Sequence, residues 1–449
     1  MNQKQAIPEA GTLDPSFGVG GVVGWPIKDQ NSNYPEALLA LDDGKLLVVE
    51  SRPSKSKAVL RRLNTDGTLD KKFGVGGSVE VHFEKGDKFT IPVLSSHPAG
   101  GWILTGQLLR PIDEFVGYGY EAVVRLLENG KLDPAFGDNG ILYLDTQKLA
   151  VPDKYALGKR LLNPNPRQQP TGNAGSATRS SVVLPDGKIV LITNYTSSAR
   201  NIRGMVVRLN SDSSLDTSFN GKGFTLIELD RIEHKHHRVK ALVVQKDGKI
   251  LVTGTFQPLD ERETYGIFVS RYLENGQLDD KFADHGIAKI SLTAGPGWSS
   301  VEAVAVRKHD GAIAVAGEMS REYIRKGWIA VLNASGSVNL VFNGGKTLYS
   351  DMLPEGVSWT HCEWQESDAL LVSGSGGGGF VGQNLSMLIA RYLADGAPDT
   401  SFNKTGWAVY RTGEPVTLGC VILKNQRIAM CGATTSPTDY MGYILRYYG

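Results

Sequence analysis

The sequence predicts an all-β protein, a seven-bladed β-propeller of four-stranded blades, and three observations carry this prediction. A Leu-Asp-x-x-Phe motif recurs about every 60 residues. Each interval holds an apolar hairpin with a tight turn, followed by a third strand that ends in Arg-Leu or Arg-Tyr. The chain begins with a motif and a lone strand and stops after a third strand, which favours a closed ring of blades.

The motif occurs in five clear copies and two degraded ones. The stretch GTLDPSFGVGGVV from Gly11 is nearly repeated as GTLDKKFGVGGSV from Gly67. The degraded copies begin at Val338 and Pro398. This spacing is too long for ankyrin, tetratricopeptide or leucine-rich units. Seven repeats are therefore predicted from the motif phenylalanines, which are Phe17, Phe73, Phe136, Phe219, Phe282, Phe342 and Phe402.

The hairpins account for the strands of each repeat. Asp-Gly between two apolar runs is a strong hairpin signal, because glycine accepts the positive φ of the turn. The hairpin strands are nearly continuous in Val, Ile, Leu and Ala, which is typical of sheets covered on both faces. No helical periodicity is found. Examples of the hairpins are ALLALDDGKLLVVE from Ala37, SVVLPDGKIVLITN from Ser181 and ALVVQKDGKILVTG from Ala241.

The two ends of the chain predict how the ring closes. Residues near 13–27 supply the strand that the last blade lacks, so we expect them to pair with residues near 440–449. This pairing removes two exposed sheet edges. We therefore expect one propeller domain over residues 1–449, with a long loop insertion near 147–178.

A recurring arginine predicts an ion pair inside each blade. Arginine stands seven residues before the motif leucine or its equivalent in five repeats, and Arg446 takes this place in the last strand. Val331 is the exception, and the motif that follows it has Asn339 in place of aspartate. Joint loss of cation and carboxylate indicates that the two form a structural pair. The five arginines are Arg62, Arg125, Arg208, Arg271 and Arg391.

The unit of about 60 residues with the pattern LDxSFGxxG resembles the delta-60 repeat family of bacterial proteins. The resemblance covers almost the whole chain. It implies a bacterial source and a propeller-like architecture. It implies no activity, because the family is defined by its structural motif.

Composition excludes several classes of protein. Lys plus Arg total 48 and Asp plus Glu 47, which gives no cationic patch for nucleic acid. No apolar run is long enough for a membrane span. No cofactor motif is present, and we expect a monomer. We expect a cytoplasmic protein, because no signal peptide is seen. A secreted or surface-exposed protein is the alternative if the chain is truncated. Cys362, Cys420 and Cys431 form no metal-binding spacing, and we expect Cys420 and Cys431 to lie opposite each other as buried thiols.

One face of the disc is expected to carry the variable loops, and binding usually resides in such loops. These loops precede each hairpin or join its second strand to the third. Trp298, Tyr118 and Tyr120 lie in or beside them and are candidates for stacking on a sugar or a protein partner. The alternative is that each ring packs on its own blade.

The inner strand of the sixth repeat is unusual. Aligning the hairpins on their turns places His361 where other repeats have alanine, serine, valine or glycine, and Glu363 where they have leucine or valine. The two residues share one face of a strand near the axis, with Trp359 toward the loop-rich end. A His–Glu pair can act as acid and base or hold a small ligand. The alternative is a hydrated pair that lines the channel.

The other motifs give weaker indications. The HKHH segment offers His234, His236 and His237, which can share a metal on an extended segment, but no carboxylate or cysteine completes the set. A solvated basic loop is therefore the favoured interpretation. The glycine-rich GSGGGGF lacks the lysine of a phosphate-binding loop, and no GxSxG nucleophile motif is present.

Three functions are left open by these observations. The leading hypothesis is a non-enzymatic binding or scaffolding propeller that presents its variable-loop face to a protein or glycan partner. The alternative is a hydrolase or lyase with a site at the channel mouth around His361 and Glu363. The third is a structural repeat module related to longer surface proteins.

Overall fold

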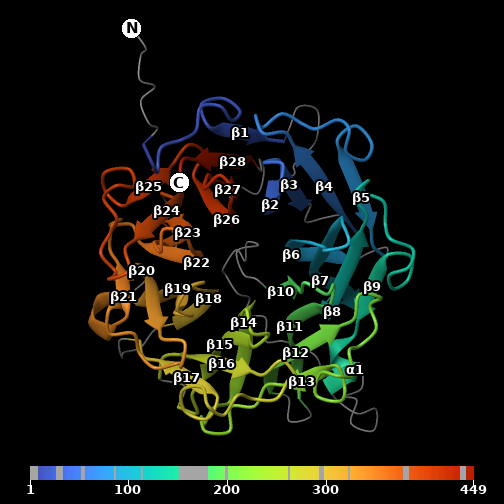
Figure 1. Cartoon of the computed structure of the whole chain (residues 1–449), viewed down its shortest axis with the longest axis vertical. Coiled ribbons are helices and arrows are strands. Elements are labelled where there is room, and N and C mark those ends of the chain that lie inside the picture. Colours follow the sequence, from blue (N-terminus) through green and yellow to red (C-terminus); the bar gives the residue numbers. More distant parts are fainter. Residues whose placement is uncertain are drawn as a thin grey trace.

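The computed structural model describes residues 9–26, 34–51, 56–84, 87–112, 115–150, 180–197, 201–260, 263–292, 298–321, 324–377, 384–434 and 441–449. In this part of the chain, seven four-stranded antiparallel sheets stand as blades around a central channel (Figure 1). The prediction of a seven-bladed all-β propeller is confirmed.

Each blade has its first strand at the channel and its last at the rim. Blades 1 to 3 comprise β2 (Tyr34–Ala40), β3 (Leu46–Ser51), β4 (Lys57–Leu63) and β5 (Ser78–His82); β6 (Lys88–Ser96), β7 (Trp102–Ile112), β8 (Phe115–Leu126) and β9 (Ile141–Leu144); and β10 (Ser181–Val183), β11 (Ile189–Thr196), β12 (Ile202–Leu209) and β13 (Phe224–Leu226).

The remaining four blades repeat this order. They comprise β14 (His236–Val244), β15 (Ile250–Gln257), β16 (Gly266–Tyr272) and β17 (Ile287–Ile290); β18 (Trp298–Val306), β19 (Ile313–Arg321), β20 (Ile324–Leu332) and β21 (Leu348–Ser350); β22 (Val357–Trp364), β23 (Leu370–Gly376), β24 (Ser386–Tyr392) and β25 (Trp407–Tyr410); and β26 (Pro415–Ile422), β27 (Ile428–Thr434), β28 (Gly442–Tyr447) and β1 (Val22–Trp25).

Ring closure occurs in blade 7, where the first strand of the chain pairs with the last. The register of β1 against β28 runs from Val22 opposite Leu445 to Trp25 opposite Gly442. A further bridge joins Leu13 to Tyr447. The predicted pairing of the two ends is confirmed, and it leaves no open edge at the seam.

The predicted Arg–Asp pair is present in the six blades that have both residues. Arg446 Nε lies 2.8 Å from Asp14 Oδ2, so one of these pairs joins the two ends of the chain. The arginine also stacks on the motif phenylalanine, as Arg446 does on Phe17 at 4.6 Å. The other Nε–Oδ2 distances are 2.8 Å for Arg62–Asp70, 3.9 Å for Arg125–Asp133, 2.6 Å for Arg208–Asp216, 2.9 Å for Arg271–Asp279 and 2.8 Å for Arg391–Asp399.

The inner strands of blades 1, 2, 4, 5, 6 and 7 carry a bulge. One sequence alignment is corrected: His361 is equivalent to Ala303 rather than Val304, because the hairpin turn of blade 5, closed by the Arg307 N–H to the Ala312 carbonyl, is one residue longer. The alignment of His361 with Ser180 is confirmed, because Ser181 pairs with Leu191 as Cys362 pairs with Val372. In five blades a glycine faces the bulge, because a Cβ there would strike backbone or aromatic atoms. These residues are Gly106, Gly254, Gly317, Gly374 and Gly432.

One short helix departs from the expectation of no helical structure. Helix α1 (Thr146–Ala150) follows β9, at the start of the predicted insertion near 147–178. The Asp145 side chain accepts the Lys148 N–H at its first turn, and Gln147 exchanges two hydrogen bonds with the Thr196 backbone. Residues 151–179 of the insertion lie outside the described residues. A single-turn 3-10 segment (Phe342–Gly345) follows the motif of blade 5.

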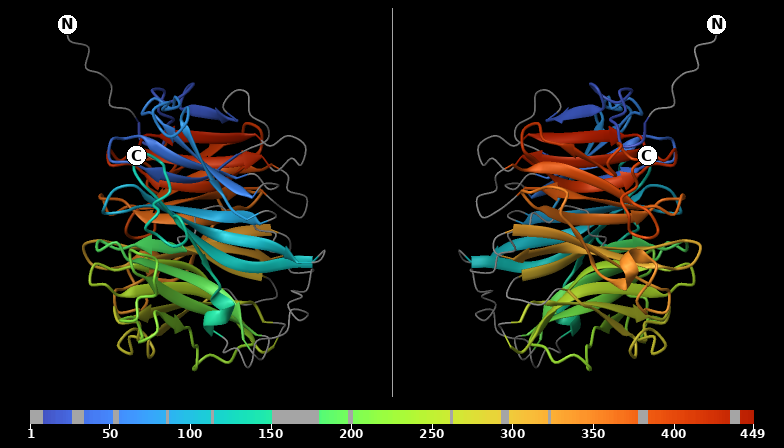
Figure 2. Two further views of the ribbon diagram at one scale, coloured as in Figure 1. Left: turned by 90° about the vertical axis from the view of Figure 1, so that its right-hand side faces the viewer. Right: turned by 90° about the vertical axis from the view of Figure 1, so that its left-hand side faces the viewer.

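The two faces of the disc differ as predicted. Figure 2 shows the disc edge-on, with the long hairpin of β7 and β8 extending beyond the rest of one face. This is the loop-rich face. Each inner strand starts there and runs toward the opposite face, which carries the short hairpin turns. No helix in the described part of the chain is long and apolar enough to cross a membrane.

Candidate functional site

An axial cavity of about 310 Å³ lies among the inner strands of blades 6, 7, 1, 2 and 3. This volume is at the lower end of the range for small-molecule sites. Aliphatic residues form much of its wall, and Ser95, Ser96 and Ser181 also line it, with the Ser181 hydroxyl hydrogen-bonded to that of Thr105 at 2.7 Å. His361 and Cys420 line the same cavity from blades 6 and 7.

His361 and Glu363 come together on the wall of the channel. Their side chains project from the same face of β22, and Nε2 of His361 lies 3.5 Å from Oε2 of Glu363. The imidazole is only 4% exposed, and its Nε2 has no hydrogen bond among the described residues. A buried nitrogen without a partner is uncommon. It therefore indicates a position at which a ligand can bind.

The bulges place a second set of polar side chains in the channel. The bulge residue is Glu36 in blade 1, Lys240 in blade 4, Glu302 in blade 5 and Thr360 in blade 6. Bulges re-aim side chains and are frequent beside active sites. Lys240 Nζ lies 3.4 Å from Glu302 Oε1, which links blades 4 and 5 across the channel wall. Glu302 also accepts a hydrogen bond from Ser300 Oγ.

Glu318 stands behind this ion pair. It is 6% exposed, and its Oε2 accepts no hydrogen bond among the described residues. Arg325 Nη1 lies 3.7 Å from that oxygen. Burial raises the pKa of Glu318 to about 7, and the nearby negative charge of Glu302 adds to this effect. The neutral form of Glu318 is therefore well populated at neutral pH, beside the ion pair of Glu302 with Lys240.

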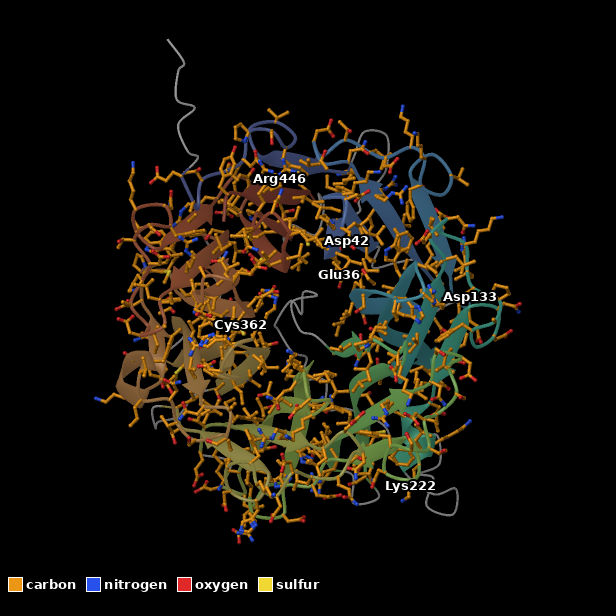
Figure 3. All side chains as sticks on the ribbon, viewed as in Figure 1. Glu36, Asp42, Asp133, Lys222, Cys362 and Arg446 are labelled. Carbon is orange, nitrogen blue, oxygen red and sulfur yellow. The ribbon has the colours of Figure 1, made fainter. Side chains whose placement is uncertain are left out.

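Glu36 is a further buried acid at the channel. Figure 3 places it beside the central opening. Burial raises its pKa to about 8, against a hydrogen bond from the Ile91 N–H that lowers it. Its Oε2 has no hydrogen bond among the described residues. Ile91 has φ +54°, a conformation that a β-branched residue rarely adopts, in the neighbouring bulge of blade 2.

The predicted aromatic candidates have different environments. Trp298 is 40% exposed at the start of β18, on the loop-rich face. Trp359 is fully buried against blade 5 and donates from Nε1 to Ser350 Oγ at 2.8 Å, so its ring offers no surface to a ligand. Tyr120 is half-buried against the core between blades 1 and 2. Tyr118 pairs with Arg110 through its backbone, and its side chain lies outside the described residues.

The three histidines of HKHH form structural hydrogen bonds. His237 Nε2 accepts the Gly204 N–H at 2.9 Å, which leaves Nδ1–H to donate to His234 Nε2, also at 2.9 Å. His234 Nδ1 then donates to the Ile232 carbonyl at 2.6 Å. His236 Nδ1 accepts the Ile202 N–H. Burial lowers the pKa of His237 to about 3. Both linked rings are therefore neutral, rather than part of a solvated basic loop.

No group of three His, Cys, Asp or Glu side chains among the described residues is arranged to hold a metal ion. All three cysteines are buried thiols. Cys420 is opposite Met430, and Cys431 is opposite Gly419, so the prediction that the two cysteines face each other is wrong by one residue. The cause is the hairpin turn, which is closed by the Leu423 N–H to the Arg427 carbonyl and is one residue longer than predicted. Burial raises the pKa of Cys420 to about 12, which makes it a poor nucleophile.

Sequence reasoning missed Glu36, Glu302 and Glu318. The bulge hides the first two, because an extra residue in the strand disrupts the alternation from which a face is read. Glu318 carries a signal that was available. It follows the repeated glycine of the second strand, where other blades have Gln107, Thr255, Ser375 and Ala433.

Three segments of the sequence match the family described as "Domain of unknown function (DUF5122) beta-propeller": residues 184–219, 245–282 and 370–402. Each segment ends at a motif phenylalanine. The match supports a β-propeller family. No curated protein matches the sequence.

Solved structures with a similar fold include the polysaccharide lyase Uly1, with a TM-score of 0.50, 11% identity, and coverage of 99% of this chain and 98% of that chain. Sqt1 from Chaetomium thermophilum has a TM-score of 0.45 at 12% identity, with 94% and 97% covered. The alpha-L-arabinanase of Penicillium chrysogenum, complexed with arabinobiose, has 0.42 at 10%, with 80% and 93% covered. At 11% identity the likeness to the lyase concerns the propeller fold alone.

Proposed function

We propose that the protein is an enzyme that cleaves a carbohydrate chain in its axial channel, with His361 and Glu363 as the acid–base pair. The observation that carries the proposal is the His361 ring, which is buried, lacks a hydrogen bond at Nε2 and lies 3.5 Å from a carboxylate on the wall of a cavity. This position has no imidazole in the other blades, so blade construction does not require it.

The geometry suits proton transfer at a bond to oxygen. The Nε2 of a protonated His361 can donate to the oxygen of a leaving group, and an ionised Glu363 beside it stabilises the imidazolium form. In a hydrolytic reaction, the C–O bond to the leaving group breaks as that oxygen takes the proton from His361 Nε2, a water oxygen bonds to the carbon, and the carboxylate of Glu363 accepts the proton of that water. Catalytic hydrogen bonds are often long in free enzymes and shorten when substrate is bound, so 3.5 Å is compatible with this role.

The choice of a carbohydrate substrate has two supports. The propeller fold is shared with a polysaccharide lyase along nearly the full length of both chains. The cavity wall also has serine residues beside aliphatic ones, a mixture that suits a sugar ring. We also infer that the repeat is of the delta-60 type, because the segments that match the β-propeller family end on its motif.

The proposal is tested by the rate of depolymerisation of a panel of polysaccharides, measured as new chain ends. General acid–base groups contribute about 10²- to 10⁴-fold to rate. We expect Glu363→Gln and His361→Gln each to lower turnover by that factor with the melting temperature unchanged. Leu340→Ala, which removes an exposed side chain from the face with the short turns, is the control and should turn over at the wild-type rate. Turnover by both variants at the wild-type rate would reject the assignment.

Non-enzymatic binding at the loop-rich face is the second candidate. It is favoured by the exposed apolar side chains of Trp298, Leu259 and Met441, which lie on three different blades near that face. Wild-type protein that binds a glycan or protein partner, and keeps that binding in His361→Ala and Glu363→Ala, without turnover of any tested polysaccharide, would favour this function over catalysis.

A further inference from the structure

One face of blade 5 carries a row of polar side chains that leads from the loop-rich face toward the channel. Trp298, Ser320 and Arg325 are aligned across three strands, and Ser300, Glu318 and Gly327 form the next row. Side chains of directly paired residues lie on the same face of a sheet. The rows are two residues apart along each strand, which is roughly 7 Å.

This face is turned toward blade 6. A Cβ on Gly327 would lie 2.6 Å from both Cδ1 and Nε1 of Trp359, so the indole of blade 6 occupies the space above that glycine. The hydrogen bond from Trp359 to Ser350 fixes the indole there. The polar row is therefore closed below by Trp359, whereas Trp298 at its outer end is exposed.

Glu318 is the buried polar group of this row whose Oε2 has no hydrogen bond among the described residues, although Arg325 Nη1 lies 3.7 Å away. Its neighbours Ser300 and Arg325 lie on the adjoining strands, with Glu302 and Lys240 at the channel side. A carboxyl group enclosed to this degree has an energetic cost unless a hydrogen-bond partner arrives. A ligand hydroxyl group would supply one. Because burial raises the pKa of this acid to about 7, its neutral form is populated and can both donate and accept.

We propose that Trp298, Ser300, Glu318 and Arg325 form a sugar-binding subsite between blades 5 and 6, at the loop-rich mouth of the channel. The apolar face of one sugar ring packs on the exposed indole, and its hydroxyl groups bond to Glu318, Ser300 and Arg325. The subsite leads inward to Glu302, whose bulge is equivalent to that of Thr360, the residue before His361. The assignment rests on the carbohydrate substrate of the proposed function, but it concerns binding and not turnover.

The subsite is tested by calorimetric titration of the full chain with hexasaccharides of cellulose, arabinan and polygalacturonate, which separate neutral from acidic sugars. We expect wild-type protein to bind at least one of these probes. Trp298→Ala and Glu318→Leu should each raise Kd at least tenfold for it. Glu318→Gln, which keeps one donor and one acceptor, should stay within threefold of the wild type.

Two controls separate the subsite from a general effect on the fold. Leu340→Ala removes an exposed apolar side chain from the opposite face. Glu121→Gln alters a half-buried acid in blade 2, whose pKa desolvation likewise raises to about 7. Both should bind like the wild type. Binding of no probe by the wild type, or equal Kd for Trp298→Ala and Leu340→Ala, overturns the assignment. Loss of binding in Trp298→Ala with no turnover in any variant would retain the subsite and reject the catalytic proposal.

Discussion

The charged residues of the Leu-Asp-x-x-Phe motifs, here called the blade connectors, differ from the buried acids beside the channel in how fully they are hydrogen-bonded. In the connectors, each aspartate lies against an arginine and accepts turn N–H groups, as Asp399 does from Arg391 and Ser401. In the channel, Glu36 and Glu318 each have an oxygen without a hydrogen bond among the described residues. The first arrangement recurs in six blades, whereas the second occurs at single positions. Repetition with full hydrogen bonding indicates a structural role, and a single buried acid with an oxygen that lacks a hydrogen bond indicates a candidate site.

Their pKa values differ in the same way. Arginine and turn hydrogen bonds hold the pKa of Asp399 below its usual value despite burial. Burial without such partners raises the pKa of Glu36 to about 8. Each of the following experiments tests this contrast, from the largest expected effect to the smallest.

Arg391→Val should cost about 2–3 kcal/mol in the free energy of unfolding, because it leaves Asp399, whose side chain is 14% exposed, without its cation; a fully buried charge would cost about 3–5 kcal/mol. The double variant Arg391→Val, Asp399→Asn should recover most of that loss. Blade 5 carries this combination naturally as Val331 and Asn339, and the Asn339 amide oxygen still accepts the Val341 and Phe342 N–H groups. Chemical denaturation measures both variants. A double variant as unstable as the single one would show that the cation has another role.

Glu36→Gln should change the pH dependence of stability in the opposite direction to a paired aspartate. The pKa of Glu36 rises from 4.5 to about 8 on folding, so its contribution to stability is complete below pH 4.5 and is lost as pH rises toward 8. The wild type should therefore lose up to about 1.4 kcal/mol per pH unit relative to Glu36→Gln across this window. Parallel stability curves from pH 5 to pH 8 would show that Glu36 is not held as a neutral acid.

His237→Gln tests the hydrogen-bonded histidines. Burial lowers the pKa of His237 from 6.5 to about 3, so its contribution is complete above pH 6.5 and is lost as pH falls toward 3. Glutamine can accept the Gly204 N–H without titrating. We expect the wild type to lose about 1.4 kcal/mol per pH unit relative to the variant between pH 6 and pH 4. Equal slopes in thermal or chemical denaturation would contradict the neutral state of this ring.

Lys424→Ala is expected to have the smallest effect on stability of these variants. Lys424 and Asp42 form an ion pair at 2.9 Å, but both side chains are well exposed, at 71% and 89%. Exposed pairs of this kind contribute little, because solvent screens them. We expect no measurable change in melting temperature at physiological salt. A shift as large as that of Arg391→Val would show that burial is not what separates the two classes.

The repeats made the fold predictable, because each blade presents the same pattern and errors in one copy are corrected by six others. The Arg–Asp pair could be predicted from Val331 and Asn339, where both partners change together. The seam could be predicted because a strand was missing at one end and available at the other.

The site was only partly predictable. His361 and Glu363 were found because a charged pair replaces apolar residues within a repeat, and the structure brings them within 3.5 Å. Glu36 and Glu302 were hidden by bulges, which shift the register at the positions that face the channel. The environment of Trp359 was also hidden, because packing between neighbouring blades is not encoded by the spacing within one blade.

The most direct test of the account is a crystal structure of the protein soaked with an oligosaccharide that it binds. The account predicts a sugar ring on Trp298, a hydroxyl group within hydrogen-bond distance of Glu318 Oε2, and the chain continuing inward to His361. Density for the sugar on the outer rim or on the face with the short turns, with the channel free of sugar, would contradict it.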